Sequence, residues 1–312
     1  MNPEVSVICI AYNQRDYICR CLDSIFGQVT DFPYEVIVHD DASTDGTAEI
    51  IRSYSKKYPD KLIPILEKEN QFKLGKNITQ LTSRYARGKY IALCECDDWW
   101  TDPSKLQIQF NYMEKRPDCA LCTHSVTCYD GNNGNKIGEF RASESDRDFD
   151  TNEVILGGGG LFGTNSMFYR SDFRELPEEF LNWGVGDYPT TIYLSLCGNV
   201  HYINQSLSAY RFCAKGSWSE KYQDKDIAID SNNLLISGLR RIQNVYFGQF
   251  DDAIEQIIME TKVNNAVLNK DIKAVFLGDL RDYFRSLDIV SKLKLYVRFL
   301  FPNVYKFLSN RI

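Results

Sequence analysis

The first hundred residues alternate short apolar segments with helical patterns, and this order constrains the fold more than any other feature of the sequence. The apolar segments cover residues 5–11, 35–39, 62–66 and 90–94. They predict strands that are buried on both faces, as in a parallel sheet. Between them, residues 17–26, 47–58 and 78–86 carry apolar side chains at helical spacing. We therefore predict an α/β fold with a mostly parallel central sheet flanked by helices.

Acidic side chains follow two of these predicted strands. Asp40, Asp41 and Asp45 come after the second strand, and a second group, Glu95 to Asp98, follows the fourth. The carboxyl ends of parallel strands form one edge of a sheet, where ligands collect. Carboxylate oxygens at such an edge suit Mg²⁺ or Mn²⁺, which bridge substrate phosphates with only one or two protein carboxylates. The alternative is a solvated acidic turn that caps the next helix.

Several linked motifs extend this interpretation. Residues 5–13 (VSVICIAYN), 35–47 (EVIVHDDASTDGT) and 88–103 (GKYIALCECDDWWTDP) resemble, in order and spacing, the opening of family 2 glycosyltransferases. Residues 186–189 (GDYP) and 198–211 (GNVHYINQSLSAYR) resemble later motifs of that family. The resemblance implies the GT-A fold, a nucleotide-sugar donor and a Mg²⁺ or Mn²⁺ cofactor. It departs from the family at Ile10, at Ala42, which replaces a frequent glycine, and at Glu95, which replaces an aspartate.

The resemblance also implies roles for individual residues. Asp98 would ligate the metal, and Asp187 would be the general base. The donor-binding positions are Ala11, Tyr12, Asp41, Lys76, Asp97 and Arg211. For Asp187 the residues alone favour another interpretation, which is a helix N-cap before Pro189.

The expected reaction follows from charge and acidity. A departing nucleoside diphosphate gains negative charge, which a metal stabilises. The acceptor hydroxyl is a weak acid, so a carboxylate such as Asp187 assists attack by accepting its proton. A single in-line displacement would invert the anomeric centre. We expect an inverting transfer from a nucleotide sugar, with UDP as the expected nucleotide, to a hydroxyl of a glycan or lipid-linked acceptor in surface polysaccharide synthesis.

The chain divides into two predicted regions. Residues 1–220 would form the catalytic domain, and residues 221–312, where helical periodicity dominates, a C-terminal helical appendage. Residues 286–312 carry five basic residues against one acidic residue, interleaved with apolar ones. This pattern is compatible with an anionic membrane surface or with packing against the catalytic domain. Pro302 would interrupt the helix.

Composition limits the partners and the compartment. A formal net charge of -6 argues against a nucleic-acid partner. Ten cysteines without a recognisable secretory signal or membrane-spanning run indicate free thiols in a reducing compartment. We expect a cytoplasmic protein, and the two alternatives for residues 286–312 place it either on the inner face of the membrane or free of it.

Weaker motifs favour ordinary structural roles. Cys119, Cys122, His124 and Cys128 have zinc-like spacing, but their segment reads as a strand. After the strand-like residues 120–129, the polar segment up to about Asp150 predicts a loop. Residues 157–160 (GGGG) predict a mobile loop, and residues 164–166 (TNS) either line the acceptor cleft or cap the next element. Trp218, like Arg211, falls where relatives close over the donor.

Three rival functions remain. A nucleotidyltransferase would carry a glycine-rich loop after the first strand, and a dinucleotide-dependent oxidoreductase would carry Gly-x-Gly-x-x-Gly. Residues 11–15 (AYNQR) match neither. A catalytically silent binding scaffold stays possible because motifs alone do not establish turnover.

Overall fold

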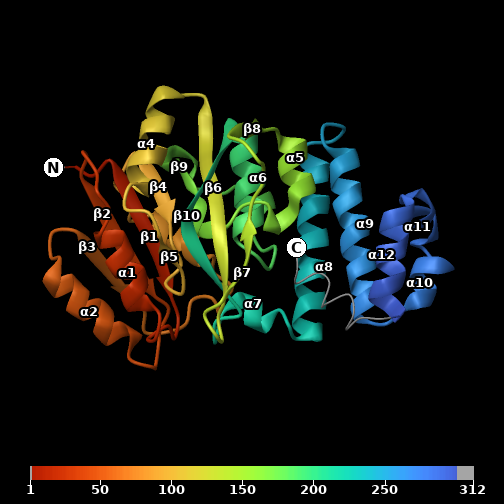
Figure 1. Ribbon diagram of the computed structural model, residues 1–312, viewed down its shortest axis with the longest axis horizontal. Coiled ribbons are helices and arrows are strands. Elements are labelled where there is room, and N and C mark those ends of the chain that lie inside the picture. The colour runs from red at the N-terminus through yellow and green to blue at the C-terminus, as the bar shows by residue number, and fades with distance from the viewer. Residues whose placement is uncertain (1, 301–312) are drawn as a thin grey trace. The chain divides into compact units, whose positions relative to one another are not determined.

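The computed structural model describes residues 2–300, which fall into two compact units (Figure 1). The first unit comprises the chain up to Asn182 together with Gly186–Glu220. The second comprises Trp183–Val185 and the chain from Lys221 onward.

The first unit is built on one ten-stranded sheet. Along the sheet the strands follow the order β3-β2-β1-β4-β9-β6-β10-β5, with β7 paired to β6 and β8 to β10. Their bounds are β1 Val5–Ala11, β2 Tyr34–Asp40, β3 Leu62–Leu66, β4 Tyr90–Leu93, β5 Trp99–Trp100, β6 Cys119–Asp130, β7 Lys136–Phe140, β8 Arg147–Phe149, β9 Phe168–Arg170 and β10 Asn199–Phe212.

The helices of this unit follow the predicted alternation. Figure 1 shows α1 and α2 packed over β1 to β3. α1 buries an apolar stripe of Ile18, Cys21, Leu22 and Ile25 against the sheet. The bounds are α1 Ile18–Phe26, α2 Thr47–Lys57, α3 Ile78–Ser83, α4 Lys105–Lys115, α5 Thr151–Gly157, α6 Asp187–Cys197 and α7 Trp218–Lys221. Four 3-10 turns, η1 Gly158–Gly160, η2 Thr164–Ser166, η3 Ser171–Phe173 and η4 Glu178–Phe180, complete it.

The two halves of the sheet differ in direction. β3, β2, β1 and β4 are parallel, as predicted. Beyond β4, strand β9 is antiparallel to β4 and β6, and β5 is antiparallel to β10. The sheet is therefore mixed. All seven residues of β2 are buried, which explains why this strand could be recognised from its apolar pattern in the sequence.

Two local predictions were wrong. Residues 130–150 contain β7 and β8 where the sequence predicts a polar loop, because these edge strands are largely solvent-accessible and carry no buried apolar run. Residues 157–160 are helical, since Gly157 ends α5 and the next three residues form η1.

The second unit is helical. It contains α8 Lys225–Val245, α9 Asp251–Leu268, α10 Ile272–Phe276, α11 Arg281–Ser286 and α12 Ile289–Leu300. Trp183 is 1% exposed, and a Cβ at Gly238 would lie 2.3 Å from its ring, so α8 can approach this indole only through a glycine. Val263, Val275 and Leu295 form a second small core. Residues 301–312, which include Pro302 and much of the basic tail, lie outside the described residues.

Candidate active site

The acidic loop after β4 runs beside the end of β1. The backbone amides of Cys94 and Cys96 donate to the carbonyls of Ile8 and Ile10 at 3.0 Å each. These bonds extend the parallel register of β1 and β4 into the loop. They bring residues 95–98 to the carboxyl edge where β1 and β2 also end.

Asp98 is the most tightly held carboxylate at this edge. It is 2% exposed, and its Oδ1 accepts the backbone N–H of Arg211 at 2.8 Å. Its Oδ2 accepts the side-chain amide of Asn165 at 2.8 Å. The Asn165 amide also donates to the Ala209 carbonyl and accepts from Ser208 Oγ, so its orientation is fixed.

Three neighbouring carboxyl groups crowd this edge. Burial, followed by the charges of Asp97 and Asp187, raises the pKa of Glu95 to about 8. Burial, followed by Asp97 and Glu95, raises the pKa of Asp98 well above its usual range. Burial and mutual repulsion therefore disfavour full ionisation of this group of carboxyl groups.

Asp187 is the first residue of α6, directly after its N-cap Gly186. Its Oδ2 accepts the hydroxyl of Thr164 at 3.1 Å, and its Oδ1 accepts the backbone amide of Tyr188 at 2.8 Å. Burial raises the pKa of Asp187, whereas these two hydrogen bonds oppose the rise. A carboxylate with a raised pKa is better matched to accepting a proton near neutral pH.

Consecutive residues of η2 connect the two carboxylates. Thr164 bonds Asp187, and Asn165 bonds Asp98. Asn165 and Ser166 are fully buried, so neither lines an acceptor cleft, and that alternative for them was wrong. The turn instead holds the predicted base beside the predicted metal ligand.

The predicted nucleoside end of the site is formed by β1, β2 and the loop after β3. The Asp41 amide donates to the carbonyl of Ala11 at 2.9 Å. The Asp41 carboxylate accepts the backbone amides of Gln71 and Phe72 at 2.6 and 3.1 Å. Asp41 thus anchors the loop that carries Lys76, whose own amide donates to the Gln71 carbonyl and whose side chain is exposed.

Tyr12 extends from the end of β1 and is half-buried. The next residue, Asn13, has a φ of 53°. The backbone amide of Asn13 donates to Ser43 Oγ at 2.8 Å, and its side-chain Oδ1 accepts the backbone amide of Thr44 at 2.8 Å. These bonds tie the turn after β1 to the turn after β2. They therefore fix the backbone position from which the Tyr12 side chain extends.

The residues at this edge fit a divalent cation. Glu95, Asp97 and Asp98 supply hard oxygen atoms, and burial, the largest cause in each case, raises the pKa of all three carboxyl groups, so a cation beside them would favour their ionised forms. Within residues 2–300 no cluster of three or more acidic, histidine or cysteine side chains is arranged to hold a metal by itself.

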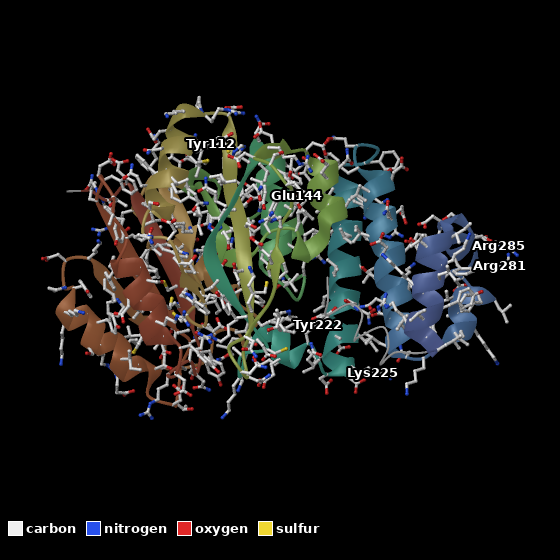
Figure 2. The ribbon with its side chains drawn as sticks, in the orientation of Figure 1. Tyr112, Glu144, Tyr222, Lys225, Arg281 and Arg285 are labelled. Atoms are coloured by element: carbon white, nitrogen blue, oxygen red, sulfur yellow. The ribbon has the colours of Figure 1, made fainter. Side chains whose placement is uncertain are left out.

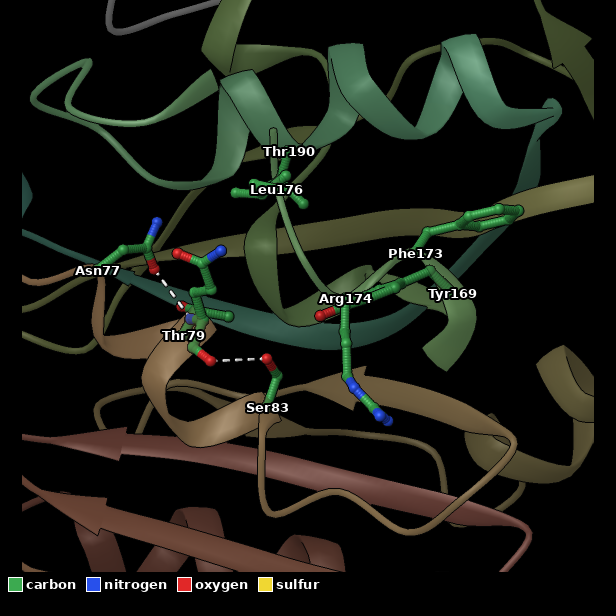
Figure 3. Close-up of a pocket in the computed structure, with 9 residues that line it drawn as sticks. Asn77, Thr79, Ser83, Tyr169, Phe173, Arg174, Leu176 and Thr190 are labelled. Carbon is green, nitrogen blue, oxygen red and sulfur yellow. Dashed lines mark hydrogen bonds between the residues drawn. The ribbon is translucent and has the colours of Figure 1, made fainter. Parts of the chain in front are cut away.

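A separate small pocket lies between α3, η3 and α6 (Figure 3). Asn77 and Gln80 line it on one side, and Phe173 and Arg174 on another. Thr190, one turn after Asp187 on α6, completes the lining. None of the predicted site residues lines this pocket.

The contacts that hold the site together could not be predicted from the sequence, although residues 164–166 stood out as a polar triplet. The pairing of Asn165 with Asp98 spans 67 positions of the chain, and that of Thr164 with Asp187 spans 23. A polar triplet after a glycine was visible, but no local pattern indicates which carboxylates it would contact.

The sequence matches a known protein family and several known proteins. The family described as glycosyl transferase family 2 matches residues 6–177. An uncharacterised protein of Mycobacterium tuberculosis strain H37Rv is 35% identical over 228 residues, covering 71% of this chain and 62% of that protein. The poly(ribitol-phosphate) beta-glucosyltransferase of Bacillus spizizenii is 25% identical over 296 residues, covering 93% of this chain and 42% of that protein. The chain thus spans less than two thirds of the length of these relatives.

A solved structure shares the fold. Residues 1–349 of Staphylococcus aureus TarS, in complex with UDP-GlcNAc, match with a TM-score of 0.64 and 17% identity. The match covers 99% of this chain and 89% of that chain.

Proposed function

Because this chain belongs to glycosyl transferase family 2, we propose that it is an inverting glycosyltransferase that uses a nucleotide-sugar donor, with UDP as the nucleotide. The observation that carries the proposal is the η2 turn, which holds Asp98 through Asn165 and Asp187 through Thr164. Donor activation and proton removal need neighbouring groups, and this turn provides them.

Asp187 is the proposed base. Its carboxylate would accept the proton of the acceptor hydroxyl as that oxygen attacks the anomeric carbon. The Thr164 hydroxyl and the Tyr188 amide hold the carboxylate in one orientation. Attack from the side opposite the leaving diphosphate would invert the anomeric configuration.

Asp98 is the proposed ligand of Mg²⁺ or Mn²⁺. Such a cation would supply positive charge against the oxygens of the departing diphosphate. The chain contributes the position of the carboxylate, which Asn165 and the amide of Arg211 fix from two sides. Glu95 and Asp97 add negative potential that favours cation binding.

Donor recognition is proposed along the edge formed by β1 and β2. Tyr12 would flank the base, Ala11 and Asp41 would contact the nucleoside, and Lys76 would approach it from the loop after β3. The bonds from Asp41 to the amides of Gln71 and Phe72 support a role in shaping this loop around the nucleoside. Asp97 and Arg211 would lie towards the sugar and the diphosphate.

We assign catalysis and membrane contact to the two regions that the sequence predicts. We propose residues 1–220 as the catalytic domain and residues 221–312 as a helical region that contacts the inner membrane surface. No helix among residues 2–300 is long and apolar enough to cross a membrane. All ten cysteines are free, which supports a reducing cytoplasmic compartment.

The exposed face of α12 supports contact with an anionic lipid surface. Its apolar side chains stand in solvent at helical spacing, with lysines beside them. They are Ile289 (76% exposed), Val290 (60%), Leu293 (59%) and Leu300 (58%). Figure 2 shows Arg281 and Arg285 of α11 directed away from the helices of this unit. A lipid-linked or surface-polysaccharide acceptor would be available at such a surface.

A donor screen tests the proposed function. The full chain is incubated with Mn²⁺ and a panel of UDP-, GDP- and dTDP-sugars, and thermal stabilisation and slow donor hydrolysis are measured. We expect stabilisation by one nucleotide class that is lost in EDTA. A chain that binds none of the donors, with or without metal, would refute a transferase role.

A further inference from the structure

Two arginine side chains lie against one buried tryptophan beside the acidic edge. The guanidinium carbon of Arg20, from α1, is 3.6 Å from the centroid of the Trp99 ring. That of Arg211, at the end of β10, is 4.8 Å from the same ring and 4.6 Å from the ring of Tyr17. Trp99 is 5% exposed, so the two cations rest on a surface that is fixed to the core.

Most of the hydrogen-bonding capacity of these two groups is unused. A guanidinium carries five N–H donors. The Nε–H of Arg211 donates to the backbone carbonyl of Asp97 at 3.0 Å, and its backbone amide donates to the Asp98 carboxylate. Within the described part of the chain, no carboxylate lies within ion-pair distance of Arg20 or Arg211, and the Arg20 guanidinium makes no hydrogen bond.

The two cations are also close enough to repel each other. Partial burial, followed by the charge of Arg211, lowers the pKa of Arg20. The charge of Arg211 also acts on the Asp97 carboxylate, whose pKa it lowers, but the two guanidinium groups still repel each other, and an anion between them would relieve that repulsion. Planar guanidinium groups match the oxygens of phosphate, to which they donate paired hydrogen bonds.

We propose that Arg20 and Arg211, held on Trp99, form a phosphate-binding pair that receives the terminal phosphate of the donor's nucleoside diphosphate. The position supports this ligand, because Arg211 is bonded through its main chain to Asp98, the proposed metal ligand. The inference rests on the proposed function for the identity of the donor. Its new element is Arg20, which reaches the site from α1 and lies outside every motif considered above.

Calorimetric titration of Arg20→Gln with UDP, UMP and inorganic pyrophosphate, each with and without Mn²⁺, tests the pair. We expect UDP affinity to fall roughly tenfold, the loss typical of one charge-assisted hydrogen bond to phosphate, while UMP affinity stays unchanged. Arg20→Lys should retain part of the affinity because it keeps the charge but loses the planar fork. Arg52→Gln, which removes an exposed arginine paired with Glu49 on α2, is the matched control and should bind all three ligands normally.

The outcomes separate the inference from the proposed function. Loss of pyrophosphate affinity with UDP and UMP affinities unchanged would show that the pair binds a phosphate other than that of the donor, and would overturn the inference as stated. A wild-type chain that binds pyrophosphate through Arg20 but no UDP would leave the pair intact and refute a UDP donor. If Arg20→Gln binds UDP and pyrophosphate as the wild type does, Arg20 only covers Trp99 and the inference is overturned.

Discussion

The side-chain amide of Asn165 donates a 2.8 Å hydrogen bond to Oδ2 of Asp98 at the carboxyl edge of the sheet. Both residues are buried, and Asn165 satisfies its amide group completely through Asp98, Ala209 and Ser208. Asn165 is therefore a positioning residue for the proposed metal ligand.

Removing this amide should weaken both the fold and metal-dependent donor binding. Asn165→Ala leaves a buried carboxylate oxygen without its donor, which typically costs about 3 kcal/mol. Urea denaturation measures the stability, and calorimetry with UDP and Mn²⁺ measures the binding. Asn199→Ala, which removes an exposed amide bonded to Asp118, is the control and should change both by little. Unchanged Mn²⁺ dependence in a folded Asn165→Ala protein would contradict the positioning role.

Substitution of the two carboxylates should separate binding from transfer. Asp98→Ala should abolish the Mn²⁺-dependent part of donor affinity, because the proposed metal ligand is lost. Asp187→Asn should bind donor as the wild type does but lose transfer by roughly 10²- to 10⁴-fold, the usual contribution of a general base. Isothermal titration and a product assay on both variants provide the comparison. Undiminished transfer in Asp187→Asn would remove this residue from the mechanism.

The hydroxyl of Thr164 should set the acid limb of the pH profile. Burial raises the pKa of Asp187, and the Thr164 hydroxyl lowers it by stabilising the carboxylate. A carboxylate base works only when ionised, so with Asp187 as the proposed base we expect activity to be lost as the pH falls through this pKa. Thr164→Val removes the hydrogen bond, raises the pKa further and should move the acid limb of kcat to higher pH. The charge of Asp187 also raises the pKa of Glu95, and we expect this interaction to be the same in both proteins.

The conservative variant distinguishes this effect from general damage. Thr164→Ser keeps a hydroxyl in place and should restore the wild-type profile. Identical acid limbs in wild type and Thr164→Val would show that the hydroxyl does not tune the base.

The turn after β2 contains an alanine in a conformation that favours glycine. Ala42 has a φ of 62°, where a Cβ costs roughly 1–2 kcal/mol. Ala42→Gly relieves this cost against an entropy penalty of about 0.5–1 kcal/mol, so we expect a small net rise in the free energy of unfolding. Ala48→Gly, within α2, should instead destabilise the protein by about 1 kcal/mol. Denaturant midpoints of the two variants check the opposite signs.

The exposed face of α12 should determine binding to lipid. Leu293→Ser removes an apolar side chain that is 59% exposed, so it should leave the fold intact and reduce sedimentation with phosphatidylglycerol vesicles. Phe247→Ser removes a residue that is 82% exposed between α8 and α9, and should sediment as the wild type does. Equal partition of wild type and Leu293→Ser would refute membrane contact through this helix.

The parallel half of the sheet could be predicted from the sequence because its strands are buried on both faces. The predicted strands at residues 5–11 and 62–66 coincide with β1 and β3. β7 and β8 could not, since edge strands with accessible side chains lack that signal. Asp98 and Asp187 were predicted as site residues from motifs, and their link through η2 depends on contacts between distant segments that no local pattern encodes.

The adjacency of Thr164 and Asn165 has a mechanical consequence. Thr164 and Asn165 are adjacent in the chain and are hydrogen-bonded to the carboxylates of Asp187 and Asp98, respectively. A displacement of this turn would therefore move both carboxylates in the same direction. If the two carboxylates act as proposed, this linkage would keep their spacing constant when the surrounding loops move. A change of acceptor would then have to be accommodated by side chains outside the turn, while the reaction geometry stays constant.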